Sequence, residues 1–334
     1  MPDWRPAEPR PSRAGGLLEG RAPMEIILHV GTHRTGTTGF QAYLRAQAPR
    51  LEYRRIGFWE PTRTRKGLLS GIVPVPGGPD PAEQMRAARQ RIEFELMRTR
   101  HKRLARLVVS DENMLGMPRQ NLRERRLYPE AGERLARYLR AFNGRVTRVA
   151  LSIRPQDEYW RSLLTLAVIR GRAVPGRAEI AALAQSGQGW RGVIEALAQA
   201  LPGVEIRVFP HADFVARPDR LLMGMTGAPA LPAGAMRTPV NASPGLEKLR
   251  KIAALRGVDV TALPRARTRW EPFGEIQARV MREAYEDDLF WLRAGADGKA
   301  TLIEENRMEE RGANPAAIQK ARGHGNGIEE RRLA

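Results

Sequence analysis

The stretch EIILHVGTHRTGTTGFQAYLRAQA, residues 25–48, decides the fold that we expect for this chain of 334 residues. It opens with an apolar run, Ile26 to Val30, which has the length and composition of a buried strand. A turn between Gly31 and Gly36 follows, and apolar side chains from Phe40 onward then recur at helical spacing. A strand, a glycine-bounded loop and a helix together point backbone N–H groups at an anion, and the helix dipole adds to the attraction. The stretch therefore predicts a site for a phosphate or sulfate group.

The loop is close to the phosphate-loop pattern G-x-x-x-x-G-K-[ST] but departs from it at one position. Thr38 fills the last position, whereas Thr37 stands where the pattern has lysine, and the basic residue lies inside the loop as Arg34. Nucleoside triphosphatases use that lysine on the β- and γ-phosphates. Its absence favours a nucleotide without a triphosphate, and an ordinary glycine-rich turn with no ligand is the alternative.

The composition narrows the class of protein. Hydrophobic residues make up 42% of the chain, which is enough for a core, so we expect one large α/β domain or two modest ones. Cysteine is absent, which excludes disulfides, thiolate metal sites and cysteine nucleophiles. The longest apolar runs are too short to cross a bilayer and no signal peptide is evident, so we expect a cytoplasmic protein with no transmembrane segment.

The positive charge also bears on the partners. The formal net charge is +19, nearly all of it from arginine spread along the whole length. No zinc-finger spacing, basic heptad or aromatic-interleaved basic repeat accompanies it, although such a charge invites a nucleic-acid interpretation. We therefore expect an arginine-rich surface and an anionic nucleotide or acceptor, with no nucleic-acid partner.

Strand and helix patterns alternate along the chain and predict a three-layer α/β fold with a parallel sheet. After the first strand, whose helix is expected to end at Pro49, residues 54–59 are expected to be a short extended segment. The further predicted strands are residues 104–109, 146–153 and 204–209. Beyond residue 210 the pattern is helical, which predicts a helical C-terminal cover. Ligands of such sheets bind at the carboxyl ends of the strands.

The chain is divided by composition into three parts. Residues 1–23 are rich in proline, arginine and glycine and are expected to be a disordered extension. Residues 24–303 are expected to form the α/β domain. Residues 304–334 are polar and charged and are expected to be a loose tail.

The segment HVGTHRTGTT, residues 29–38, resembles the 5′-phosphosulfate loop of sulfotransferases, especially the bacterial and carbohydrate-type enzymes. The resemblance implies 3′-phosphoadenosine 5′-phosphosulfate (PAPS) as the sulfuryl donor, a fold related to nucleotide kinases, and no metal. Family members usually carry lysine where this chain has Arg34, so the charge is kept and the head-group geometry changes. The family often stacks adenine on an aromatic residue just after the two threonines, but Gly39 occupies that position here.

A second part of the resemblance lies in VTRVALSIRPQDEYWRSLL, residues 146–164. Arg154 stands at the end of the predicted strand and Ser162 lies eight residues later, on the predicted helix. Sulfotransferases bind the 3′-phosphate with an arginine and a serine at this spacing. A guanidinium can hold phosphate oxygens bidentately and a hydroxyl adds a neutral donor. An arginine or a serine alone is commonplace at such a position. The pair therefore supports the resemblance only in combination with the loop of residues 29–38.

The acidic cluster Ser110-Asp111-Glu112-Asn113 follows another predicted strand. Carbohydrate sulfotransferases have a catalytic glutamate just past a strand, so the resemblance implies that Glu112 is the general base. A solvated acidic turn, or a helix N-cap at Asp111, is the alternative. The same pattern also resembles the magnesium site of phosphate-loop kinases and ATPases, against which Thr37 and the Arg154/Ser162 pair both argue.

The sequence thus predicts a PAPS-dependent sulfotransferase acting on a hydroxyl, on a carbohydrate or glycoconjugate acceptor. The alternatives are a kinase or ATPase with a degenerate phosphate loop, and a nucleotide-binding protein without catalysis. The predicted catalytic residues are Glu112 and Arg34. The predicted donor-binding residues are Gly31, Thr32, His33, Arg34, Thr35, Gly36, Thr37, Thr38, Arg154 and Ser162. Asn241-Ala242-Ser243 is a weaker candidate to fold over the nucleotide.

Overall fold

A computed structural model of the protein describes residues 23–75, 77–187, 189–234, 243–306 and 308. Residues 1–22 of the predicted extension and 309–334 of the predicted tail lie outside this part of the chain, as do Asn241 and Ala242.

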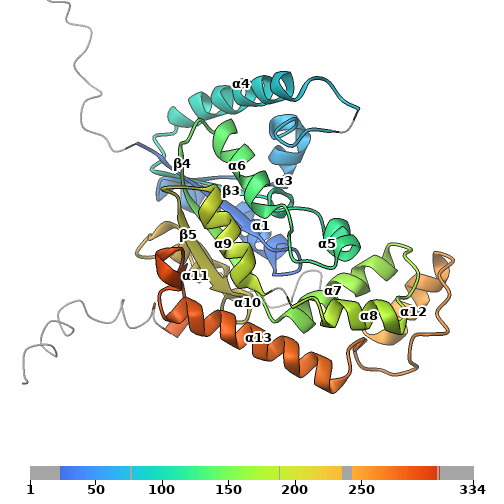
Figure 1. Ribbon diagram of the computed structural model, residues 1–334. Helices are drawn as coiled ribbons and strands as arrows, with labels where there is room; N and C mark the ends of the chain where they lie inside the picture. The colour runs from blue at the N-terminus through green and yellow to red at the C-terminus, as the bar shows by residue number, and fades with distance from the viewer. Residues whose placement is uncertain (1–22, 76, 188, 235–242, 307, 309–334) are drawn as a thin grey trace, which may run out of the picture.

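An all-parallel sheet of six strands forms the middle layer of the fold (Figure 1). Its strands are β1 (Glu25–Gly31), β2 (Ile56–Trp59), β3 (Arg106–Ser110), β4 (Val146–Ile153), β5 (Glu205–Pro210) and β6 (Thr301–Leu302). Their order is β2-β3-β1-β4-β5-β6. After β1 the chain continues to β2, which lies toward one edge of the sheet. After β4 it continues to β5, which lies toward the opposite edge. The neighbours β1 and β4 therefore diverge at their carboxyl ends, which is where such sheets bind ligands.

Successive residues of each strand pack into two separate cores, which produces the three layers. In β1, Ile26, Leu28 and Val30 belong to one core and Ile27 to the other. The strands are apolar on both faces because both faces are covered, as is usual in parallel sheets. The predicted three-layer parallel α/β fold is confirmed.

Helices cover each face of the sheet. The first core is closed by α4 (Pro81–Arg100), α6 (Ala131–Ala141) and α9 (Trp190–Ala200). The second is closed by α1 (Thr37–Ala46), α2 (Ala48–Tyr53) and α11 (Pro218–Thr226).

The remaining helices position the carboxyl edge of the sheet. Helix α7 (Gln156–Ile169) begins where β4 ends, and α12 (Leu246–Leu255) and α13 (Glu275–Arg293) both pack against it. The short elements are α3 (Pro61–Arg63), η1 (Thr64–Leu68), η2 (Glu112–Met114), α5 (Pro118–Glu124), α8 (Arg177–Ala184), α10 (His211–Phe214) and η3 (Ala296–Gly298). In Figure 1 helix α13 runs along the lower side of the molecule and α7, α8 and α12 lie together beside it.

Two details differ from the predictions. Helix α1 ends at Ala46, and Pro49 lies in the first turn of α2 instead of ending a helix. A proline fits there because the first amides of a helix need no intrahelical acceptor. Strand β6 was not predicted, since its two residues are too few to show a pattern. Across the described ranges, no helix is both long and apolar enough to cross a membrane.

Candidate functional site

A cavity of about 440 Å³ opens at the carboxyl ends of β1, β3 and β4. Its wall combines the loop after β1, the turn after β3 and the helix after β4. The lining residues are His33, Arg34, Gly36, Thr37, Thr38, Glu112, Arg154, Arg161, Ser162, Leu166, Arg170, His211, Val215, Ser243 and Arg269. Five arginines and one carboxylate line it. The cavity is therefore built for an anion.

Three of the predicted residues shape the loop and do not line the cavity. Gly31 has a φ of +58°, and a Cβ built on it would lie 2.6 Å from the Thr37 hydroxyl oxygen, so this position excludes a side chain. The Thr32 amide donates to the Thr35 hydroxyl oxygen at 3.1 Å, and that hydroxyl donates to the Thr32 carbonyl at 2.7 Å. Together with Gly36, whose φ is +81°, these residues turn the chain from β1 into α1.

Arg34 extends from the loop into the cavity. Its φ of +71° is uncommon for a residue with a side chain and is one of the ways in which functional sites carry strain. Its Nε donates to the Ser162 hydroxyl at 2.8 Å, and Ser243 lies 3.4 Å from one of its terminal nitrogens. Burial lowers the pKa of Arg34, and the neighbouring Arg154 and Arg170 lower it further. Three guanidinium groups thus share one small region.

Several buried polar atoms in this region lack protein partners in the described part of the chain, among them the Thr32 hydroxyl and one ring nitrogen of His211. Two further ones are donors on the wall of the cavity. The Thr37 side chain is only 6% exposed, and its hydroxyl has no hydrogen-bond partner among the described residues. Nε of Arg154 is also buried and has no hydrogen-bond partner among the described residues. A buried donor without a partner costs free energy, so two of them beside a cationic cavity mark where a ligand would bind.

Arg154 is held in place by neighbours on three elements. One terminal nitrogen donates to the Arg34 carbonyl at 2.8 Å, and the other pairs with Glu158 in the first turn of α7. The Trp190 indole donates to the Arg154 carbonyl at 2.7 Å. Since Ser162 lies on the same helix α7, the predicted pair meets the predicted loop in one cavity.

His33 lines the cavity but is fixed by the protein. One ring nitrogen lies 3.0 Å from the Tyr128 hydroxyl and the other 3.1 Å from the side-chain oxygen of Asn113. Its backbone amide also donates to Tyr128, at 2.8 Å. Burial lowers the pKa of His33, so the ring is neutral at pH 7 and orients the loop.

Glu112 lies in η2 on the wall of the cavity, and Arg65 of η1 pairs with it at 2.8 Å. Burial alone would raise the pKa of Glu112, but the hydrogen bond and charge of Arg65 outweigh it and the pKa lies below its usual value. Gln41 of α1 approaches the other carboxylate oxygen at 3.4 Å. Glu112 is therefore an ionised, oriented carboxylate.

Asp111 has a different role. It caps η2 by accepting the Asn113 amide at 3.0 Å, and Thr64 donates to it at 2.6 Å. Arg65 also pairs with it, at 2.7 Å. The N-cap alternative is thus the correct interpretation of this residue.

Several residues of the site were missed from the sequence: lining residues of the cavity, and Arg65, which pairs with Glu112 behind the cavity wall. Arg170 caps the end of helix α7, eight residues after Ser162. Arg154 and Ser162 are also eight residues apart, so this spacing could have identified Arg170. Arg65 could not be found in this way, because it lies in a short irregular helix with no pattern of its own. The others are Arg161, Leu166, His211, Val215 and Arg269. Ser243, from the weaker candidate Asn241-Ala242-Ser243, does line the cavity. His211 is neutral, since burial and then Arg154 lower its pKa to about 4.

Comparisons of the chain with known protein families, with curated proteins and with solved structures find no match. In the described ranges, no cluster of three or more His, Cys, Asp or Glu is arranged to hold a metal ion.

Proposed function

We propose that the protein is a sulfotransferase that moves a sulfuryl group from PAPS to a hydroxyl of a carbohydrate or glycoconjugate. The observation that carries the proposal is the meeting of the first loop, Arg154, Ser162 and Glu112 in one cationic cavity. These residues follow the carboxyl ends of three strands, β1, β3 and β4, that are far apart in the sequence. Each is a residue or loop for which the sequence predicts a part in this reaction.

The donor set of the cavity suits a nucleotide with phosphate groups at both ends of its ribose. The loop and the unpartnered Thr37 hydroxyl would hold the 5′-phosphosulfate at the start of α1. Arg154 and Ser162 would hold the 3′-phosphate, and Arg170 beside them adds a further charge. The pairing of Arg34 with Ser162 at 2.8 Å links the two phosphate sites directly.

In the proposed reaction the acceptor oxygen bonds to sulfur as the bond from sulfur to the oxygen of the 5′-phosphate breaks. Glu112 takes the proton of the acceptor hydroxyl, because it is ionised and lies on the cavity wall. Arg34 and the loop amides stabilise the negative charge that develops on the leaving phosphate. A low pKa makes Glu112 a modest base, so positioning and charge stabilisation carry most of the rate.

One observation counts against the kinase or ATPase alternative. An acid after the strand beside β1 would have to hold Mg²⁺ in such an enzyme. Asp111 is bound by Arg65 and Thr64, and Glu112 is bound by Arg65. Both candidate acids are therefore already paired with protein groups.

Calorimetry with 3′-phosphoadenosine 5′-phosphate (PAP), the product of the donor, tests the proposal. We expect PAP to bind, Arg154→Ala to weaken it by about a hundredfold because a charge-assisted contact is lost, and 5′-AMP to bind much more weakly. Equal PAP affinity in Arg154→Ala would reject the 3′-phosphate site.

Transfer of labelled sulfate from PAPS tests the catalytic step. Glu112→Gln should lose transfer while it keeps PAP affinity, because the amide has nearly the same shape but takes no proton. Magnesium-dependent ATP hydrolysis that survives Glu112→Gln would instead favour the ATPase alternative. PAP binding with no transfer to any hydroxyl acceptor would leave a nucleotide-binding protein without catalysis.

A further inference from the structure

A second, larger hollow adjoins the cavity on the side of α5. It has a volume of about 1170 Å³, against about 440 Å³ for the cavity, and the two share Leu166 and Arg170 of the α7 segment. Helix α5 begins six residues after Glu112, so one wall of this groove continues directly from the turn that carries the proposed base. We call the hollow between α5 and the end of α7 the α5–α7 groove. Its position makes it an approach to the site of transfer.

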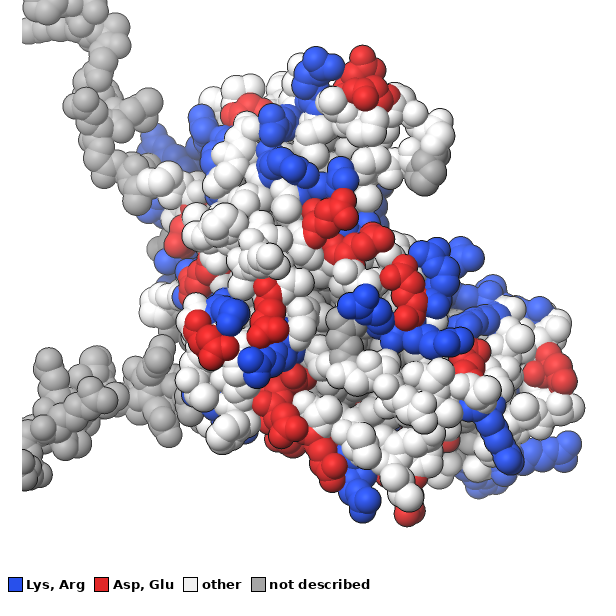
Figure 2. All heavy atoms as spheres, in the orientation of Figure 1, with Lys and Arg blue, Asp and Glu red and all other residues white. Residues whose placement is uncertain are grey.

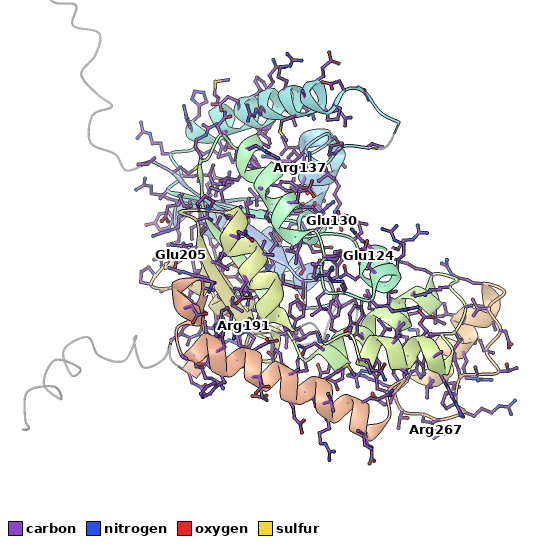
Figure 3. The ribbon with its side chains drawn as sticks, in the orientation of Figure 1. Glu124, Glu130, Arg137, Arg191, Glu205 and Arg267 are labelled. Carbon is purple, nitrogen blue, oxygen red and sulfur yellow. The ribbon has the colours of Figure 1, made fainter. Side chains whose placement is uncertain are left out.

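The floor and the rim of the α5–α7 groove differ in character. Apolar side chains of both helices form the floor, among them Leu122, Leu163 and Ala167. The rim carries Arg119 and Arg123 on α5, and Arg170 and Arg172 at the end of α7. Glu130 is the one acid among the residues that line it, and Figure 3 shows Glu130 at the foot of α6. Lys and Arg side chains gather over this part of the molecule in Figure 2.

Three of the four rim arginines are available to a ligand, whereas Arg172 pairs with Glu179 at 2.5 Å. Within the described part of the chain, no carboxylate pairs with Arg119 or Arg170. Among the described residues Arg123 forms a salt bridge only with its neighbour Glu124, at 3.0 Å, and the Arg123 side chain is 75% exposed. An exposed pair of this kind is worth little and exchanges readily for a better partner. Glu124, Glu130 and Glu179 offset part of the rim charge, but Arg119 on one side and Arg170 on the other keep the field of the open groove positive.

The shape and charge of the groove together select among occupants. A neutral acceptor would gain nothing from the rim, and a small anion would not need a groove of this size. Nucleic acid is disfavoured because none of the described residues that line the groove is aromatic, and single-stranded bases are bound largely by stacking on aromatic rings. A chain of acidic sugars satisfies both features, since its carboxylates can meet arginines on both rims.

We infer that the α5–α7 groove binds the acceptor, and that the acceptor is an acidic polysaccharide whose chain runs between the arginine rims and presents a hydroxyl to Glu112. This inference rests on the proposed sulfuryl transfer and adds the class of acceptor and the place where it binds. Arg119 and Arg123 are the determinants of that class on α5.

The test measures the binding of acidic hexasaccharides of hyaluronan, unsulfated chondroitin and polygalacturonate by calorimetry, with PAP saturating. At least one should bind, and chitohexaose, a neutral chain of the same length, should bind at least tenfold more weakly. In Arg119→Gln/Arg123→Gln we expect a loss of roughly tenfold or more, because two charge-assisted contacts are removed. PAP affinity should be unchanged, since neither residue lines the donor cavity.

The control removes the same charge elsewhere. Arg86 of α4 and Arg279 of α13 are exposed and lie outside both hollows, so Arg86→Gln/Arg279→Gln should bind the hexasaccharides as the parent does. An equal loss of hexasaccharide affinity in both double variants would show that net charge alone causes the loss, and would overturn the inference. So would the failure of all three acidic chains to bind, or equal binding of chitohexaose.

The two proposals fail in different ways. If PAP does not bind, the proposed function fails. If PAP binds but Arg119→Gln/Arg123→Gln leaves acidic hexasaccharide affinity unchanged, only the groove assignment fails. A single-stranded RNA that binds more tightly than every acidic hexasaccharide, and loses affinity in the same variant, would also overturn the assignment in favour of nucleic acid.

Discussion

At the scale of single residues, Arg65 controls the charge of Glu112. Burial raises the pKa of Glu112, and the Arg65 hydrogen bond at 2.8 Å reverses that effect. In the parent protein the pKa is depressed, so the stability that this pair provides is present above the unfolded pKa and is lost as the pH falls through the folded pKa.

Arg65→Met should therefore change the pH dependence of stability in a defined direction. With Arg65 removed, burial leaves the pKa of Glu112 above its unfolded value, and stability then falls as the pH rises from about 5 to about 7, by about 1 kcal/mol for a shift of one unit. Urea unfolding across this range measures it. Arg63→Met is the control, because Arg63 pairs with Glu95 at 3.5 Å and is half exposed. The same slope in both variants would contradict the assignment to Glu112.

Residue types and positions in the sequence identified most of the cavity. Arg34, Glu112, Arg154 and Ser162 follow strands or lie in the first turns after them, where parallel sheets bind ligands. The direction of each side chain was not predictable. That Arg34 turns toward Ser162 depends on the positive φ of Arg34 and on the position of α7, which are properties of the folded chain.

At the scale of elements, α13 joins the cover to the site through Asp288. Its carboxylate accepts the amides of Trp190 and Arg191 at 2.7 and 3.1 Å and so caps α9. Gln156, the first residue of α7, donates to it at 3.2 Å. Gly189 leaves room for this contact, since a Cβ there would lie 2.6 Å from an Asp288 oxygen. One side chain of α13 thus fixes the starts of two helices.

A second contact holds α9 against α13. Arg191 lies near the start of α9 in Figure 3, and its guanidinium stacks 4.9 Å from the ring centre of Trp291 in α13. This contact adds cation–π attraction to the hydrogen bonds of Asp288.

Asp288→Ala should destabilise the protein by about 1–3 kcal/mol, because it removes a helix cap and leaves buried amides without an acceptor. It should also weaken PAP binding, since the Trp190 indole holds the Arg154 carbonyl at 2.7 Å. Urea unfolding and calorimetry measure the two effects. Asp259→Ala removes an aspartate that bonds Thr261 on the surface, and should change neither. Unchanged stability in Asp288→Ala would show that α13 does not anchor these helices.

The elements differ in how far the sequence could predict them. β4 (Val146–Ile153) was predicted with both its bounds, because a mainly apolar run of strand length lies there between a glycine turn and a proline. The contact between α13 and α9 was not predictable, since the aspartate that caps α9 lies 98 residues away in the sequence. Caps supplied by another helix leave no local signal.

At the scale of the whole molecule, the net charge of +19 has two separate effects on an anionic ligand. Surface arginines far from the cavity attract the ligand from solution, and salt screens them because the Debye length is only about 10 Å at 0.1 M. Arg34, Arg154 and Arg170 contact or border the ligand site directly, where screening is weak. Composition reveals the sum of these charges, and only the fold separates the distant ones from those in the cavity.

This separation predicts how salt changes the kinetics of PAP binding. Between about 50 and about 300 mM salt, the association rate should fall by about tenfold while the dissociation rate changes much less, because screening acts on long-range attraction. Stopped-flow measurements give both rates. Arg86→Gln/Arg279→Gln should lower the association rate slightly and leave dissociation unchanged, whereas Arg154→Ala should mainly speed dissociation. If salt instead acted mainly on dissociation, the cavity arginines would be exposed to solvent in the complex, and their assignment as direct, weakly screened contacts of the ligand would be wrong.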